Sequence, residues 1–153
     1  MTVGQIHTDV ITAYKEAIAG SPYAKLKIVP IDRETLDVVR DQFETEYDGN
    51  YSREMSMRVT TLNEDLYFFA ASAKKWKVAC NEVQELIEQR LLKGIGEYSV
   101  DDISCESDRN GETGGVLHIS FTITHYEVAD FDGRDADADY METIDTDMTI
   151  TTE

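Results

Sequence analysis

The chain has 153 residues, 41% of them hydrophobic, and a formal net charge of −17 from 31 acidic and 14 basic residues. This length suits one domain with its own core, and the hydrophobic content excludes a wholly disordered chain. The charge excludes nonspecific binding to nucleic acid or to anionic membranes, because both need a surface rich in Lys and Arg.

The first predicted element is an amphipathic helix over residues 3–19, where apolar side chains recur at intervals of three and four. Gly20 follows it and is suited to end a helix. Residues 24–31 alternate briefly between apolar and polar side chains. They predict a short strand limited by Pro30, because proline cannot donate to a strand ladder.

The segment from residue 32 to 53 permits two interpretations. In the first, Asp32 caps a helix whose apolar side chains are Leu36, Val39, Phe43 and Tyr47. In the second, the same residues are extended. Within this segment the sequence YDGNY at 47–51 predicts a turn, because Asp, Gly and Asn favour turn geometry.

Two strands are predicted next, at 53–62 and 66–72, because apolar and polar residues alternate in both. The polar residues Asn63–Asp65 would join them. A change of period to three and four residues follows. It marks the next element as a helix rather than a further strand.

This second helix is predicted over residues 73–93, with Ser72 as its N-cap and Gly94 at its end. Its apolar stripe is formed by Trp76, Ala79, Cys80, Val83, Leu86, Ile87 and Leu91. Cations are unfavourable at a helix N-terminus, which is already positive. Three lysines would nevertheless lie in the first turn, where they are either solvated or available to an acidic surface: Lys74, Lys75 and Lys77.

The last predicted strands are residues 97–107 and a long strand from 116 to 128, with the loose turn DRNGETGG between them. On the long strand, one predicted face is apolar: Leu117, Ile119, Phe121 and Ile123. The other face carries hydroxyls, an imidazole and a phenol instead of the usual Lys and Glu: His118, Ser120, Thr122, Thr124 and Tyr126. This composition fits either a catalytic surface or a surface that meets another copy of the chain.

Together these elements predict an α+β domain over residues 1–129, with a mostly antiparallel sheet covered on one face by two helices and a long C-terminal β-hairpin. Residues 130–153 contain nine acidic residues and one Arg, which predicts an acidic C-terminal arm held by a neighbouring subunit. The candidate contacts in this arm are Asp135, Asp137 and Asp139.

Catalytic and metal chemistry find little support in the sequence. The acidic segment after Asp130 fits no EF-hand register, because glycine does not fall at the sixth position. Cys80 and Cys105 lack metal-binding spacing and are expected to be reduced and buried. Cys105 with His118 or His125 would be a catalytic pair, but no nucleophile signature surrounds them. We expect no enzyme, no metal and no cofactor.

Targeting signals are also missing from the pattern. No apolar run approaches the length of a membrane span, and no positive leader precedes an apolar core. We therefore expect a protein that is neither secreted nor membrane-spanning.

The order of these elements resembles the tail terminator (tail completion) proteins of long-tailed phages and related viruses. The resemblance covers residues 3–128 and rests on element order, length and helix placement, notably LYFFAASAKKWKVACNEVQELIEQRLLKG followed by VLHISFTITHYEV. It implies an α+β subunit without catalytic residues that forms a ring, usually a hexamer. The acidic arm departs from the family pattern.

The resemblance also implies the partners and the location. The ring would cap the tail tube protein and receive the head–tail connector, in the tail or neck of a virion assembled in the host cytoplasm. DNA would pass through the lumen without specific binding.

Two alternatives remain. Another tail or neck component, such as a tube subunit or a head–tail adaptor, fits less well because tube subunits tend to be richer in strand. A small halophilic binding module or enzyme fits less well because Lys is as common as Arg and the acidic residues concentrate in the tail.

Overall fold

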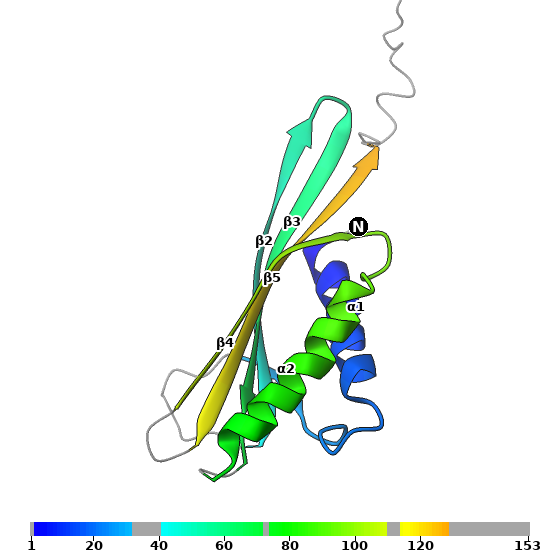
Figure 1. The fold of residues 1–153 in the computed structure, drawn as a ribbon. Coiled ribbons are helices and arrows are strands. Elements are labelled where there is room, and N and C mark those ends of the chain that lie inside the picture. The colour runs from blue at the N-terminus through cyan, green and yellow to red at the C-terminus, as the bar shows by residue number, and fades with distance from the viewer. Residues whose placement is uncertain (1, 32–40, 72–73, 110–113, 129–153) are drawn as a thin grey trace, which may run out of the picture.

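The structure is a computed structural model, and it describes residues 2–31, 41–71, 74–109 and 114–128. It is an α+β fold with these elements: α1 (Val3–Ile18), β1 (Ile28–Pro30), β2 (Gln42–Glu54), β3 (Met57–Phe69), α2 (Trp76–Leu92), β4 (Ser99–Arg109) and β5 (Gly115–Val128). The five strands form one mixed sheet in the order β1-β2-β3-β5-β4. Among the described strands, only β1 and β2 pair in parallel. Both helices lie on the same side of this sheet (Figure 1).

The core lies between the two helices and the sheet. The apolar face predicted for β5 is confirmed, since Leu117, Ile119, Phe121 and Ile123 are at most 2% exposed. The ring of Phe121 meets Tyr14 of α1 edge to face, with centroids 6.3 Å apart. The helix stripes supply the facing residues of the core: Ile6, Val10, Ala13, Tyr14 and Ile18 from α1, and Cys80, Val83, Ile87 and Leu91 from α2.

The N-terminal helix begins and ends close to its predicted limits. Thr2 caps it by accepting a hydrogen bond from the Gln5 backbone N–H at 3.1 Å, and the Gln5 side chain accepts from the Thr2 N–H at 2.7 Å. This reciprocal pair satisfies two backbone donors that would otherwise have no helical partner. The strand predicted at 24–31 is shorter, because residues 24–26 form turns in which Ala24 and Leu26 donate to Ser21 and Tyr23.

The turn predicted at 47–51 is wrong, because β2 runs through these residues and pairs with β3 along its whole length. Gly49 is needed there for packing. A Cβ at Gly49 would lie 2.8 Å from the Val3 side chain and 3.0 Å from Leu62. The chain turns later, at residues 55–56, where Met55 has a left-handed φ of 56°.

The segment 32–53 is therefore extended where the structure describes it. Phe43 and Tyr47 belong to β2, so the helical interpretation is wrong for them. Its other residues, Asp32, Leu36 and Val39, lie outside the described part of the chain.

The break predicted at Asn63–Asp65 is also wrong, because β3 is continuous from Met57 to Phe69. Glu64 faces α1 and is 1% exposed, while the side chains before and after it point to the opposite face. Because Glu64 is polar but points into the core, it interrupts the alternating pattern of the strand, and the sequence there looks like a loop.

The second helix starts at Trp76, three residues later than predicted, and the predicted cap Ser72 lies outside the described residues. Lys75 occupies the N-cap position with a left-handed φ of 58°, which breaks the helical hydrogen bonding before Trp76. The indole of Trp76 packs over the β5 backbone at Gly115, where an added Cβ would lie 2.0 Å from the ring. This contact fixes where the helix begins.

The β2–β3 turn and the C-terminal end of β5 extend past the helix layer (Figure 1). β4 pairs antiparallel with β5, with a register shift between Asp101 and Ser104. The predicted connection at 110–113 and the predicted arm at 130–153 lie outside the described residues.

Candidate functional site

One whole face of the sheet is not covered by the helices. We call this side of the sheet, away from α1 and α2 (Figure 1), the open face, and the strand registers of β2, β3, β5 and β4 define which residues belong to it. Residues directly opposite in an antiparallel pair share a face, so the strand registers assign its members. The predicted contact residues His118, Ser120, Thr122, Thr124 and Tyr126 all lie on it, opposite Tyr67, Asp65, Asn63, Thr61 and Val59 of β3.

Cross-strand contacts hold the centre of the open face in place. His118 Nε2 lies 2.7 Å from Asp65 Oδ1, and the His118 ring stacks on Tyr67 with centroids 4.5 Å apart and planes 6° from parallel. Thr122 donates a hydrogen bond to Asn63 Oδ1 at 3.1 Å. Burial and the neighbouring carboxylate of Asp65 raise the pKa of Tyr67, so its hydroxyl stays protonated. The result is an ordered ridge of polar and aromatic side chains.

Sequence reasoning missed the β3 half of this ridge. Asn63, Asp65 and Tyr67 occur at a period of two, which is the signal that would have placed them on one face. Reading residues 63–65 as a loop interrupted that signal.

The open face is acidic on both sides of the ridge. Among the described side chains of these four strands, the open face carries no Lys or Arg. Its exposed or half-buried carboxylates are Glu46, Asp48, Glu54, Asp65, Asp101, Glu106 and Asp108. Like charges spread over one surface produce a negative potential that repels phosphate and favours a basic or strongly screened partner.

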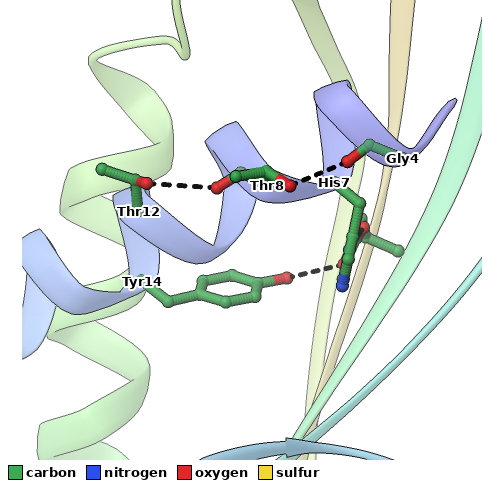
Figure 2. A network of polar contacts seen from close by, with 6 residues as sticks. Gly4, His7, Thr8, Thr12 and Tyr14 are labelled. Atoms are coloured by element: carbon green, nitrogen blue, oxygen red, sulfur yellow. Dashed lines mark hydrogen bonds and ion pairs between the residues drawn. The ribbon is translucent and has the colours of Figure 1, made fainter. Parts of the chain in front are cut away.

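A second polar cluster lies in the core, between α1 and β3. The Glu64 side chain is fully buried, with His7 Nδ1 2.5 Å from its Oε2 and the Tyr14 hydroxyl donating to its Oε1 at 3.2 Å. Figure 2 shows His7 and Tyr14 extending from one side of α1, while the Thr8 and Thr12 hydroxyls bond to helix carbonyls. The His7 ring also stacks on Tyr47 at 4.1 Å.

The electrostatics of this cluster follow from burial. Burial raises the pKa of Glu64 above its ordinary value, and hydrogen bonding and attraction to His7 oppose that rise. Burial, followed by the charge of Glu64, raises the pKa of Tyr14 well above its usual range. With its carboxylate enclosed, the cluster positions α1 on the sheet rather than presenting a base to a substrate.

The structure does not assemble the catalytic pairs considered from the sequence. Cys105 lies on the helix side of the sheet opposite Ile119, whereas His118 lies on the open face. Cys80 is buried as expected, but Cys105 is only half-buried, because it lies on the edge strand β4. Burial and the neighbouring Glu88 raise the pKa of Cys105 to about 12, and burial raises the pKa of Cys80 to about 11. Both groups are therefore thiols at neutral pH and weak nucleophiles.

His125 is half-buried, and its ring packs edge-on to Tyr98 at 5.3 Å. Across residues 2–31, 41–71, 74–109 and 114–128, no group of three His, Cys, Asp or Glu could hold a metal ion. In that same portion of the chain, no helix combines the length and apolar character needed to cross a membrane.

The three lysines among the predicted contact residues do not lie on the open face. Lys74, Lys75 and Lys77 are exposed at the start of α2, in the helix layer. The first two precede the helix, so their predicted place in its first turn is wrong. The predicted arm contacts Asp135, Asp137 and Asp139 lie outside the described residues.

Comparison with known proteins adds no relative: no protein-family model and no curated protein matches this chain.

Proposed function

We propose that this chain is a non-enzymatic structural subunit of a virion, which assembles into a ring that caps the tail tube and joins it to the head connector. The observation that carries this proposal is the open face. It is a sheet face that neither of the described helices α1 and α2 covers, lined at its centre by hydroxyl, imidazole and phenol groups in cross-strand contact. Polar side chains of this kind suit a wet contact surface or the wall of a lumen.

The charge of the open face supports the same function. A lumen that DNA traverses must not retain it, and retention of DNA is driven by Lys and Arg contacts to phosphate. An acidic wall without described cations on its four strands would let DNA pass. The net charge of −17 on the whole chain acts in the same direction.

The finer parts of the proposal concern the C-terminal region. β4 and β5 would form a long β-hairpin, and the acidic arm from residue 130 would cross to a neighbouring subunit. Lys74, Lys75 and Lys77 are exposed cations that such an arm would contact through Asp135, Asp137 and Asp139. A hexamer is the ring size that the resemblance implies, and the tube protein and the head–tail connector are the other partners.

A second candidate function is a small binding module adapted to high salt. The acidic open face favours it, because dense surface carboxylates keep a protein soluble when salt screens its charges. Such a module would be a monomer, whereas a tail terminator, tube subunit or adaptor would assemble.

Light scattering of the purified full chain, combined with electron microscopy, separates these functions. Chains of net charge −17 repel each other, and salt weakens this repulsion, because at 0.1 M the screening length is about 10 Å. The proposal therefore expects closed rings that become more abundant as ionic strength rises from a low value. A monomer at every protein and salt concentration would contradict the ring and favour the binding module.

A further inference from the structure

The turn between β2 and β3 has the features of a contact element. We call residues 53–58 the tip. Met55 at its end is 93% exposed and has a φ of 56°, a conformation that glycine or asparagine normally supplies in such turns. Met57 beside it is also exposed. An apolar side chain held at a strained and fully exposed position gains nothing within its own subunit, and strained residues tend to occur at functional sites.

Two arginines flank this apolar residue and are held in place. Arg53 and Arg58 are directly opposite in the β2–β3 ladder, so their side chains share a face. Arg53 Nε donates to the Met55 carbonyl at 3.2 Å, and the Arg58 guanidinium lies 4.1 Å above the Tyr51 ring. The tip thus combines an apolar end with two cations on one face. Glu54 of the tip lies on the other face, and Glu127 of β5 is directly opposite Arg58 in the ladder.

A groove of about 400 Å³ elsewhere on the subunit has the complementary character. It lies between the loop after α1 and the middle of α2, with Pro22 and Leu86 as its apolar part and Glu82 and Glu85 as its acidic part. Tyr23 is fixed in its wall by donating to Glu82 Oε1 at 2.5 Å. Its volume falls within the range of pockets that accept small ligands, and it is large enough to receive a methionine side chain.

The tip and the groove cannot meet within one subunit. The first residue of α1, Val3, contacts β2 just below the tip, where its N–H donates to the Tyr51 hydroxyl at 3.0 Å. The groove begins beyond the other end of α1, and a helix of 16 residues spans roughly 24 Å. The β2–β3 turn and the loop after α1 lie at opposite ends of α1 (Figure 1), so the length of this helix separates the tip from the groove.

We infer that the tip of one subunit docks in the groove between the loop after α1 and α2 of a second copy of this chain. Met55 enters the apolar part beside Leu86, and Arg53 and Arg58 face Glu82 and Glu85. Contacts between two different surfaces are head-to-tail, and they produce a closed ring when the rotation between neighbours closes. This inference rests on the proposed ring, and it names the contact that overcomes the repulsion between acidic chains.

Disulfide trapping tests the contact directly. One variant would carry Met55→Cys together with Leu86→Cys, and a second would carry Met55→Cys with Gln89→Cys, which is also in the groove. Both would be oxidised at pH 7.5. We expect a ladder of covalent oligomers that ends at the ring size, and no ladder from any single variant. The native thiols should not interfere, because the pKa of Cys80 is raised to about 11 and that of Cys105 to about 12. Met55→Cys with Glu97→Cys, an exposed position outside the groove, is the matched control.

Charge reversal provides an independent test on the same full-length chain. Arg53→Glu should weaken association about tenfold or more, and Glu85→Arg in the same chain should restore most of it. Lys93→Glu makes the same change in net charge at an exposed position away from both surfaces, and it should have a much smaller effect.

The outcomes also separate this inference from the proposed function. If oligomers form but neither cysteine pair yields covalent oligomers, the tip-and-groove contact is wrong. The same holds if Glu85→Arg does not restore the association lost in Arg53→Glu. In both cases the proposed ring is not contradicted. A chain that stays monomeric under all conditions would overturn both.

Discussion

Replacing His7 by Phe should reveal how much the buried pair with Glu64 contributes to stability. The change removes the nitrogen 2.5 Å from Glu64 Oε2 and keeps an aromatic ring beside Tyr47. The fully buried carboxylate would retain only the Tyr14 hydroxyl at 3.2 Å. Leaving one member of a buried pair without its partner costs about 3–5 kcal/mol. Because Tyr14 remains and the His7 side chain is 16% exposed, we expect the lower end of that range, about 3 kcal/mol at pH 7.5.

The matched variant Glu64→Gln removes the charge and keeps an amide that Tyr14 and His7 can still bond. It should stay within about 1 kcal/mol of the wild type, and adding it to His7→Phe should recover much of the loss. Urea unfolding followed by the single tryptophan, Trp76, measures each free energy of unfolding.

The pH dependence of the same variant follows from the pKa of Glu64, which burial raises above its ordinary value of 4.5. The unfolded chain then ionises at lower pH than the folded one. The cost of the buried charge is therefore absent below pH 4.5, grows as pH rises through the folded-state pKa, and is fully present above it. His7→Phe should lose less stability at pH 5 than at pH 7.5. This reasoning would be refuted if the losses of unfolding free energy in His7→Phe and Glu64→Gln simply add in the double variant and the loss in His7→Phe does not change with pH.

Three further outcomes are expected. Phe121→Ala should cost about 3–5 kcal/mol in urea unfolding, because Phe121 is only 2% exposed, and a loss below about 1 kcal/mol would show that its face is not core. Deleting residues 130–153 should preserve cooperative thermal unfolding by circular dichroism and weaken assembly in light scattering; loss of cooperativity would place the arm in the core. At pH 7.5 the raised pKa values of the buried Cys80 and the half-buried Cys105 should make both thiols react slowly with a thiol reagent, and a reaction complete within seconds in the folded protein would contradict this expectation.

The sequence was most informative where a single period repeats over many residues. The stripe from Ile6 to Ile18 predicted α1 to within one residue at its end, and the alternation from Leu117 to Ile123 predicted both faces of β5. These periodic patterns are reliable because every apolar residue in them packs against the same buried surface.

The failures occurred where one contact determines the local structure. Gly49 is in a strand because the Val3 side chain packs against its backbone, although its neighbours favour a turn. Glu64 is in the core because His7 and Tyr14, more than 49 positions away in the chain, satisfy its carboxylate. The turn at Met55 follows from the register of β2 with β3, and methionine has no turn preference that would reveal it. Local preferences cannot anticipate partners from distant segments.

The same reasoning applies to the candidate site. The β5 half of the open face was predictable from alternation alone. The β3 half, with Asp65 and Tyr67 against His118, requires the strand pairing to be known.

Electron microscopy of virus particles made without this chain tests the central claim most directly. A subunit that ends the tail tube and receives the head connector should leave tails of abnormal length, or tails that are not joined to filled heads. Adding the purified wild-type chain to an extract of cells infected with the virus that lacks it should restore the joining of tails to heads. Tails of normal length, properly joined to filled heads in the absence of the chain, would contradict the account.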